Sequence, residues 1–454
     1  MTETISQPTA PSVGGSIEAT AVLESLREHM LVDGFDLVLD LDASHGSTLV
    51  DARDGTEWTD LFTFFASNAL GMNHPRLAAD AAFRAELARA AVNKPSNSDV
   101  YTVELARFVD TFSRVLGDPA LPHLFLVDGG ALAVENALKV AFDWKSRHNE
   151  AHGRSPELGT KVLHLKHAFH GRSGYTMSLT NTEPGKVARF PKFDWPRITS
   201  PYPGHDADGA PRDVEALEAR ALAEARAAFE AHPHDIACFV AEPIQGEGGD
   251  HHLRPEFLQA MQALCHEHDA LFVLDEVQTG GGFTGTAWAY QQLGVQPDVV
   301  AFGKKLQVCG VMAGGRVDEV GDNVFHISSR INSTWGGNLV DMVRSRRILE
   351  VYEADGLVER AGRVGAGLLA RLEKLAAAHP GVVTDPRGRG LMCAVSLPSR
   401  EVRDAVVAGM HAEHVLMLGC GERSVRFRPA LTVEENVLDH AVAVLDRVVN
   451  RVAS

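Results

Sequence analysis

Short apolar runs alternate with helical stretches through the middle of the chain. The runs are HLFLV at 123–127, KVLHL at 161–165, IACFVA at 236–241, ALFVL at 270–274 and DVVAF at 298–302. Between them, apolar residues recur at helical spacing, as in the stretches 131–144 and 213–231. Strands that alternate with helices in this way predict an α/β fold with a parallel sheet covered on both faces.

Both ends of the chain follow a different pattern. The stretch 35–65 predicts short antiparallel strands. The last hundred residues predict helices near 357–379 and 400–413, a strand in RGRGLMCAVSL between them, and a final helix after the segment SVRFRPAL. We therefore expect a large central domain and a smaller domain built from both chain ends. The expected divisions are a disordered tail at 1–16, small-domain segments at 17–85 and 346–454, and a large domain at 86–345.

Composition narrows the classes of partner. A net charge of −17 argues against binding to nucleic acid or to an anionic membrane surface. No apolar run reaches the roughly 18 residues of a membrane span, and the N-terminus lacks the apolar core of a secretory signal. The five scattered cysteines include no CxxC, and the histidines include no HExxH, so we expect free thiols, a cytoplasmic protein and no metal site.

Chemically useful residues follow several of the predicted strands. Ligands of open α/β sheets bind beyond the carboxyl ends of the strands. Asp275 and Lys304 end two successive strands and should therefore emerge at the same edge. Glu242 ends another strand, with Glu247 close behind it.

A small-residue turn stands at the same predicted edge. The sequence DGGAL places Gly129, Gly130 and Ala131 at a helix N-terminus, where backbone N–H groups can bind an anion. An anion cradle, a carboxylate and a lysine amine together suit one ligand, pyridoxal phosphate. Its aldehyde forms a Schiff base with lysine, and its ring nitrogen needs an acid partner.

Each signal also has a purely structural interpretation. A Gly-Gly before a helix is commonly only a tight turn, and an Asp after a strand commonly caps a turn. For the sequence His170-Gly171-Arg172, taken alone, an ordinary surface turn is the favoured interpretation. Of the adjacent Lys304 and Lys305, we expect one to be solvated, since neighbouring side chains in an extended segment point to opposite sides.

Six motifs carry a resemblance to a known family. From about residue 35 onward the sequence resembles the class III aminotransferases, which have the aspartate aminotransferase fold (fold type I). The motifs are GGALAVENALK, AFHGRSGY, AEPIQGEGG, LDEVQTG, PDVVAFGKK and STWGGN. NKPSNSDVY and FGKKLQVCGVMAGG resemble most the lysine 6-aminotransferase branch. The resemblance implies a mixed, mostly parallel seven-stranded sheet and a small α+β domain.

The resemblance also implies pyridoxal 5′-phosphate as cofactor and a role for each nearby residue. Lys304 would bond to the cofactor aldehyde and later move a proton between the substrate carbon and the cofactor. Asp275 would hold the ring nitrogen protonated. The other implied contacts are Phe169 on the ring face, Gln278 at the phenolic oxygen, and Gly130 and Ala131 at the phosphate. Glu242 would support the cofactor loop, and Thr334 would reach the phosphate from the other subunit of a homodimer.

Substrate recognition is assigned in the same way. Arg172 would bind the distal carboxylate of every substrate, and Arg426 the proximal carboxylate of 2-oxoglutarate. Glu247 would pair with Arg426 while the amine donor is bound, because an uncompensated buried charge is costly. Asn332 would touch substrate, and Phe65 would narrow the pocket.

The implied reaction converts L-lysine and 2-oxoglutarate to L-glutamate and 2-aminoadipate 6-semialdehyde, which cyclises to piperideine-6-carboxylate. Ornithine, 4-aminobutyrate or diaminobutyrate stays open as donor, since one methylene is worth only about 1–3 kcal/mol. A fold type I aminomutase and a catalytically silent relative also stay open. Two residues depart from the family pattern: Phe283 stands where arginine is usual, and Lys305 where glycine follows the cofactor lysine.

Overall fold

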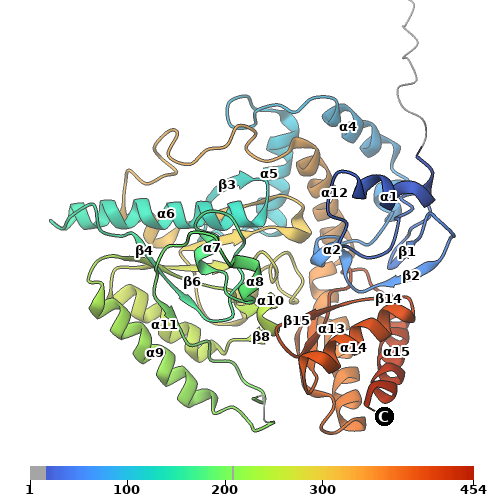
Figure 1. Ribbon diagram of the computed structural model, residues 1–454. Helices are drawn as coiled ribbons and strands as arrows, with labels where there is room; N and C mark the ends of the chain where they lie inside the picture. The colour runs from blue at the N-terminus through green and yellow to red at the C-terminus, as the bar shows by residue number, and fades with distance from the viewer. Residues whose placement is uncertain (1–16, 207–208, 454) are drawn as a thin grey trace, which may run out of the picture.

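A seven-stranded sheet forms the centre of the molecule, in the order β3-β11-β10-β9-β6-β4-β5 (Figure 1). The strands are β3 (His123–Val127), β4 (Lys161–Leu165), β5 (Arg197–Ile198), β6 (Ile236–Ala241), β9 (Leu271–Asp275), β10 (Val299–Phe302) and β11 (Cys309–Ala313). β11 runs antiparallel to both of its neighbours, and the other neighbouring strands pair in parallel. The expected fold class is confirmed. The computed structural model describes residues 17–206 and 209–453, so the expected tail at 1–16 lies outside the described residues.

Successive residues of each strand enter hydrophobic cores on opposite sides of the sheet. In β9, Leu271 packs with residues of α6 (Gly130–Ala151), whereas Phe272 packs with residues of α9 (Val214–Ala231) and α11 (Pro255–Glu267). Figure 1 shows α6 along one side of the sheet and α9 and α11 along the other. Because both faces are buried, the strands are uninterrupted apolar runs, as the sequence predicts.

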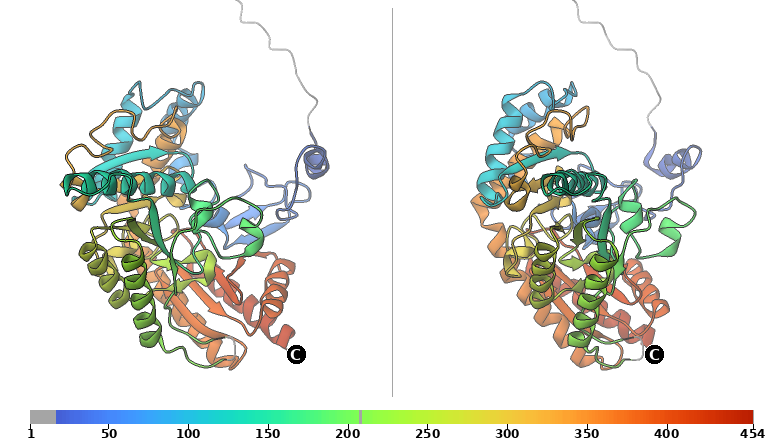
Figure 2. Two further views of the ribbon diagram at one scale, coloured as in Figure 1. Left: turned by 60° about the vertical axis from the view of Figure 1, so that its left-hand side comes forward. Right: turned by 90° about the vertical axis from the view of Figure 1, so that its left-hand side faces the viewer.

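The two ends of the chain meet in a three-stranded sheet, and their elements lie side by side in Figure 2. β1 (Thr48–Val50) is antiparallel to β2 (Glu57–Asp60), and β14 (Val415–Leu416) pairs with β2 in parallel. A four-stranded antiparallel sheet, in the order β12-β13-β16-β15, lies nearby. Its strands and their companion helices are β12 (Thr384–Arg389), β13 (Met392–Ser396), β15 (Leu418–Cys420), β16 (Ser424–Phe427), α13 (Leu357–Ala378), α14 (Arg400–Ala412) and α15 (Glu435–Ala453).

Helices also join the central part to the part built from the chain ends. α12 (Leu339–Asp355) packs against α5 (Val103–Val115) and α4 (Ala81–Ala91). The expected domain boundaries, after residues 85 and 345, fall inside α4 and α12. The remaining short elements are η1 (Ala19–Ala21), α2 (Thr63–Ala66), α3 (Pro75–Ala78), α7 (Thr176–Leu179), α8 (Pro184–Val187), β7 (Ile244–Gln245), α10 (Gly246–Gly249), β8 (His251–His252), η2 (Ala289–Gln292), η3 (Lys304–Leu306) and η4 (Gly315–Glu319).

The first described segment buries little surface against the rest of the chain. α1 (Val22–Arg27) buries none of its residues, and it stands away from the body in both views of Figure 2. Ile17, Met30 and Leu31 are 64%, 57% and 79% exposed. Within the described ranges, no helix combines the length and apolarity that crossing a membrane requires.

Candidate active site

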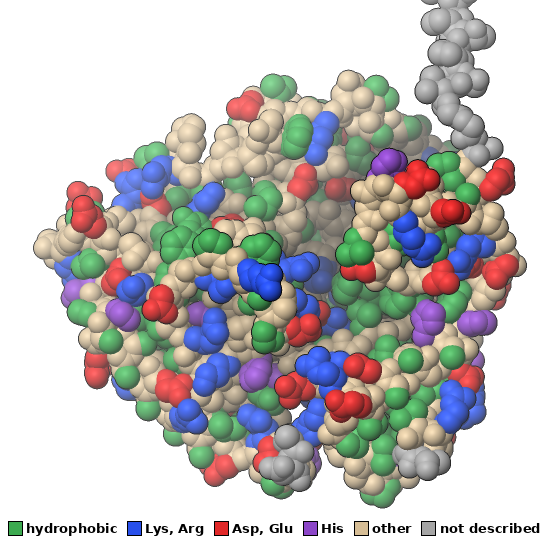
Figure 3. Space-filling model, viewed as in Figure 1, with side chains coloured by type: hydrophobic (Ala, Val, Ile, Leu, Met, Phe, Trp, Pro, Cys, Tyr) green, Lys and Arg blue, Asp and Glu red, His purple; other side chains and the backbone are tan. Residues whose placement is uncertain are grey.

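A cavity of 310 Å³ opens at the carboxyl edge of the central sheet. It is lined by Gly130, Ala131, Phe169, His170, Gly171, Arg172, Glu242, Asp275, Val277, Gln278 and Lys304. β9 and β10 are parallel, with Ala301 opposite Asp275, so Asp275 and Lys304 leave the sheet at the same edge. The structure therefore gathers most of the expected cofactor-binding residues around one space. Figure 3 shows this face of the molecule hollowed near its centre, with Lys and Arg side chains beside the hollow.

Asp275 is held in place by a buried histidine. Asp275 is 5% exposed, and its Oδ2 lies 2.8 Å from Nδ1 of His170. Its Oδ1 accepts the backbone N–H of Val277 at 3.0 Å. The interpretation of the segment at His170 as a surface turn is wrong, because this ring is buried against Asp275. Sequence reasoning missed the pairing; the available signal was the position of His170 beyond the carboxyl end of β4.

Glu242 is a buried carboxyl that organises two loops around the cavity. Its Oε1 accepts the backbone N–H of Phe169 at 2.9 Å, and its Oε2 accepts that of Gly246 at 3.1 Å. Burial and the nearby Asp275 carboxylate raise the pKa of Glu242 well above its usual value. A buried carboxyl that receives backbone donors fixes the loop carrying Phe169.

The start of α6 forms a close-packed cradle. Gly129 has φ of 100°, a conformation that favours glycine. A Cβ on Gly130 would lie 2.9 Å from Cγ1 of Val277, and a Cβ on Gly171 would lie 2.5 Å from Cβ of Ala131. Glycine at these places lets the backbone come close, and the first N–H groups of a helix have no partner within the helix. The cradle is thus suited to an anion.

Lys304 carries the amine of the cavity. It follows β10 through Gly303 and has φ of 50° in the short helix η3. Its Nζ donates to the carbonyl oxygen of Phe65 at 3.0 Å. Burial, reinforced by Arg426, lowers the pKa of Lys304 to about 8. A substantial neutral fraction near neutral pH makes this amine a competent nucleophile and base.

Lys305 is buried and Lys304 is partly buried, so the expectation that one of the two lysines is solvated is wrong. The Lys305 side chain is 2% exposed, and its Nζ donates to the carbonyl oxygen of Ala66 at 2.9 Å. The segment is a left-handed turn into η3 and not an extended strand, so both amines reach the same neighbouring segment. The Lys305 Nζ lies 3.6 Å from the ring centre of Phe283, where a cation–π contact is favourable. The two departures from the family pattern therefore touch each other.

The segment that receives both amines is itself unusual. Thr63, Phe64, Phe65 and Ala66 have φ of 42°, 52°, 59° and 65°, a run of left-handed residues. Asp60 stabilises this turn by accepting the backbone N–H of Thr63 at 2.7 Å. Phe65 itself is half exposed, and its backbone, not its ring, makes the hydrogen bond with the amine of Lys304.

An arginine–glutamate pair lies close to the cavity. Nη1 of Arg426, on β16, is 2.6 Å from Oε2 of Glu247, and Arg426 is 3% exposed. Lys186 approaches the other oxygen of Glu247 at 3.4 Å. Burial raises the pKa of Glu247, but Arg426 and Lys186 lower it more, to about 2. The pair is therefore fully charged at neutral pH.

A second buried ion pair contacts Gln278, one of the residues that line the cavity. Arg428 and Asp250 are 2% and 0% exposed, and Nη1 of Arg428 lies 2.9 Å from Oδ2 of Asp250. The second guanidinium nitrogen of Arg428 contacts the other oxygen of Asp250 and lies 3.5 Å from Oε1 of Gln278. Sequence reasoning did not single out either residue; the sequence SVRFRP contains both arginines, and only the first was assigned a role.

Four expected substrate or cofactor residues lie at the rim of the cavity or away from it. Arg172 lines the cavity and is exposed. Phe65 is not a lining residue; it contacts Lys304 through its carbonyl oxygen and, with 5.8 Å between the Lys304 Nζ and its ring centre, through its ring. Asn332 and Thr334 are exposed residues in the loop before α12, and neither lines the cavity in this chain. Asn332 instead lines a separate groove with Tyr101.

The residues present fit pyridoxal phosphate. The cradle at the start of α6 suits the phosphate, and the Asp275 carboxylate suits a protonated ring nitrogen. Lys304 provides the amine, and Phe169 and Val277 give the cavity apolar walls for a flat ring. An anion cradle, a buried acid and a lysine amine with a lowered pKa are together the groups that bind pyridoxal phosphate.

Comparisons with known proteins agree with this geometry. The chain is 67% identical over 424 residues to the L-lysine-epsilon aminotransferase of Mycobacterium tuberculosis (strain ATCC 25618 / H37Rv), covering 93% of this chain and 94% of that protein. It is 61% identical over 444 residues to the L-lysine-epsilon aminotransferase of Streptomyces clavuligerus, covering 97% and 96%. The solved structure of lysine aminotransferase from M. tuberculosis in the internal aldimine form matches with a TM-score of 0.93 at 65% identity, covering 96% of this chain and 100% of that one. The family described as Aminotransferase class-III matches residues 32–449, and the chain belongs to this family.

Proposed function

We propose that this chain transfers the ε-amino group of L-lysine to 2-oxoglutarate, with pyridoxal phosphate as cofactor. The products are L-glutamate and 2-aminoadipate 6-semialdehyde, which cyclises to piperideine-6-carboxylate. The observation that carries the proposal is the buried pair of Arg426 and Glu247, 2.6 Å apart, close to Lys304. High identity to L-lysine-epsilon aminotransferases over nearly the whole chain supports lysine as the donor.

The proposed roles of the cofactor-binding residues follow from their positions. Bound pyridoxal phosphate supplies an aldehyde that accepts amino groups and a ring that withdraws electrons from the reacting carbon. Lys304 holds the cofactor through Nζ and, once released, carries a proton at that atom. Asp275 holds a proton on the ring nitrogen, and His170 keeps its carboxylate in place. The remaining proposed contacts are the start of α6 at Gly130 and Ala131 for the phosphate, Phe169 for the ring face, Gln278 for the phenolic oxygen, and Glu242 for the loop that carries Phe169.

The substrate assignment rests on charge. The reacting end of lysine carries no carboxylate, whereas 2-oxoglutarate has one directly beside its reacting carbon. Arg426 would bind that carboxylate, and Glu247 would neutralise Arg426 while lysine is bound, because a buried unpaired charge costs about 3–5 kcal/mol. Arg172, exposed at the rim, would bind the distal carboxylate that both substrates possess.

A panel of amine donors tests the proposal. We expect lysine to give the highest kcat/KM for glutamate formation from 2-oxoglutarate. Ornithine, one methylene shorter, should fall about tenfold or more below it. A ranking with ornithine or 4-aminobutyrate above lysine would reject lysine as the donor. An aminomutase would form no glutamate from any of them.

Glu247→Ala tests the proposed neutralisation of Arg426. Without Glu247, the Arg426 charge is uncompensated when the cationic donor enters, so we expect the lysine half-reaction to slow by at least about tenfold. The 2-oxoglutarate half-reaction should change by less than about threefold, since that substrate supplies its own carboxylate. The absorbance of the cofactor, followed over a single turnover, measures the rate of each half-reaction separately. Glu183→Ala is the matched control, because the Glu183 side chain is 43% exposed and lies 3.2 Å from the same Lys186. Equal losses in both halves would contradict the assignment.

We also propose a homodimer in which the loop before α12 contributes to the partner's site. Thr334 and Asn332 are exposed and lie outside this chain's own cavity, as residues that serve another subunit would. Val100, Tyr101 and Val103 are 62%, 77% and 63% exposed, an apolar stretch typical of an interface. Sedimentation equilibrium should give twice the chain mass.

Two further expectations are kept as proposals. The first is the division into a large domain at 86–345 and a small domain at 17–85 and 346–454. The second is a cytoplasmic location, supported by five free cysteines. Neither changes the chemistry assigned to the cavity.

A further inference from the structure

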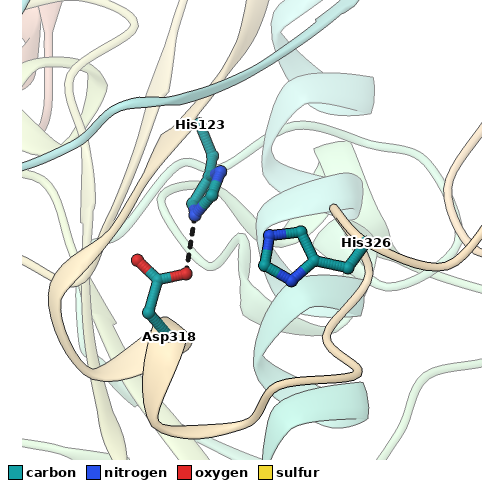
Figure 4. A group of neighbouring side chains, drawn as sticks. All are labelled: His123, Asp318 and His326. Atoms are coloured by element: carbon teal, nitrogen blue, oxygen red, sulfur yellow. Dashed lines mark hydrogen bonds and ion pairs between the residues drawn. The ribbon is translucent and has the colours of Figure 1, made fainter.

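Three potential metal ligands meet on the surface at the end of β3 remote from the cavity. His123 is the first residue of β3, Asp318 lies in η4, and His326 follows in the loop before α12. Among the described residues, one ligand atom from each lies within 4.8 Å of the other two. Figure 4 shows the three side chains turned toward a common point. None of them lines the cofactor cavity.

The first two potential ligands, His123 and Asp318, are held by a contact with each other and by contacts with residues outside the cluster. Nε2 of His123 lies 2.6 Å from Oδ1 of Asp318. The His123 ring is half buried and stacks on Phe325, with ring centres 4.8 Å apart and planes 12° apart. Nδ2 of the buried Asn323 lies 3.4 Å from the same Asp318 oxygen. Partners that orient the ligands are a regular feature of protein metal sites.

The third ligand separates this cluster from an ordinary His–Asp pair. Nδ1 of His326 lies 2.8 Å from the carbonyl oxygen of Gly321. A carbonyl only accepts, so Nδ1 carries the proton and Nε2 of the neutral ring keeps a free lone pair. Figure 4 shows this second nitrogen on the side of the ring that faces His123 and Asp318. A carbonyl bonded to the second ring nitrogen is the usual arrangement of a metal-binding histidine.

Asn323 also fixes the backbone around the cluster. Its side-chain amide donates to the carbonyl oxygens of Val317 and Val320, and its Oδ1 accepts the N–H of Phe325 at 3.0 Å. The segment from Asp318 to His326 is therefore held as a compact turn. This turn sets the positions of Asp318 and His326 relative to each other.

We propose that His123, Asp318 and His326 bind a divalent transition-metal ion, with Zn²⁺ as the best match. Two imidazoles and one carboxylate are typical ligands of Zn²⁺, Co²⁺ and Ni²⁺, and three protein ligands leave a position for water. The ion would join the edge strand β3 to the segment between β11 and α12. That segment continues to Asn332 and Thr334, so the ion would stabilise the base of the loop proposed to reach the partner subunit.

Metal titration of the holoenzyme tests the proposal. After treatment with a chelator, the protein should bind about one Zn²⁺ per chain in calorimetry, and Co²⁺ should give a visible ligand-field absorbance. Zn²⁺ should also raise the midpoint of thermal unfolding. His326→Ala should weaken Zn²⁺ binding by at least about tenfold and remove the shift in midpoint.

Two controls make the outcome decisive. His440→Ala removes an exposed histidine on α15, outside the cluster, and should leave Zn²⁺ affinity unchanged. Asp318→Asn keeps the shape of the ligand but removes its charge and should weaken binding as His326→Ala does. Zn²⁺ binding that survives in both cluster variants, or no binding by the unaltered protein at millimolar Zn²⁺, would overturn the proposal.

Discussion

Lys304→Ala is expected to reduce glutamate formation by about ten-thousand-fold or more. Proton transfer by a positioned base alone contributes about 10²–10⁴-fold, and this variant also loses the amine that holds the cofactor. The fold should survive, because among the described residues the side chain makes a single hydrogen bond, to the carbonyl oxygen of Phe65. Steady-state kinetics measure the loss, and circular dichroism checks the fold.

The neighbouring lysine supplies the matched control. Lys305→Met keeps a long, flexible side chain over the ring of Phe283 but removes the amine and its hydrogen bond to the carbonyl oxygen of Ala66. It should retain far more activity than Lys304→Ala. Borohydride reduction followed by peptide mapping should place the pyridoxyl label on Lys304 in the unaltered enzyme. A label on Lys305, or the reverse order of activity losses, would show that the two lysines have been assigned the wrong way round.

The second large effect is on stability. Asp250→Asn should lower the free energy of unfolding by about 3–5 kcal/mol, because it leaves the charge of Arg428 buried without its partner. Asparagine has nearly the same shape and tolerates the left-handed conformation that Asp250 adopts, with φ of 53°. The loss can therefore be assigned to charge and not to the backbone. Urea denaturation of the enzyme with bound pyridoxal phosphate measures this change in the free energy of unfolding.

An exposed ion pair gives the comparison. Arg114 and Glu353 are 46% and 51% exposed, with Nε and Oε1 3.0 Å apart. Glu353→Gln should cost no more than about 1 kcal/mol, since water already solvates both charges. If Asp250→Asn cost no more than this control, the buried pair would not carry the stability assigned to it. Adding Arg428→Met to Asp250→Asn should recover part of the loss, because the uncompensated charge is then gone.

Topology made the centre of the site predictable from sequence. Parallel strands bring their carboxyl ends to one edge, so the residues after each apolar run had to be neighbours. The order of apolar runs and helices was therefore enough to group Asp275, Glu242 and Lys304. Within this group, the family pattern was needed to choose between Lys304 and Lys305.

The rest of the site depended on contacts that sequence spacing does not encode. His170 pairs with Asp275 across a long stretch of chain; its position after β4 places it at the sheet edge but does not show which residue its ring contacts. The buried Lys305 amine donates to the carbonyl oxygen of Ala66, which lies 239 residues earlier in the chain. Strand β12, TDPRGR, was missed because its residues are all partly exposed and show no apolar alternation.

The three-stranded sheet made by the two chain ends has a consequence for biosynthesis. β2 lies between β1 and β14, and its contact with β14 joins residues near 60 to residues near 415. On the ribosome, one edge of β2 therefore stays unpaired until almost all of the chain has emerged. Contacts between such distant segments form slowly, and an open strand edge can pair with another chain. Chains that stall or are truncated before β14 should therefore aggregate through the N-terminal hairpin, and chaperones would need to shield that hairpin for nearly the whole of synthesis.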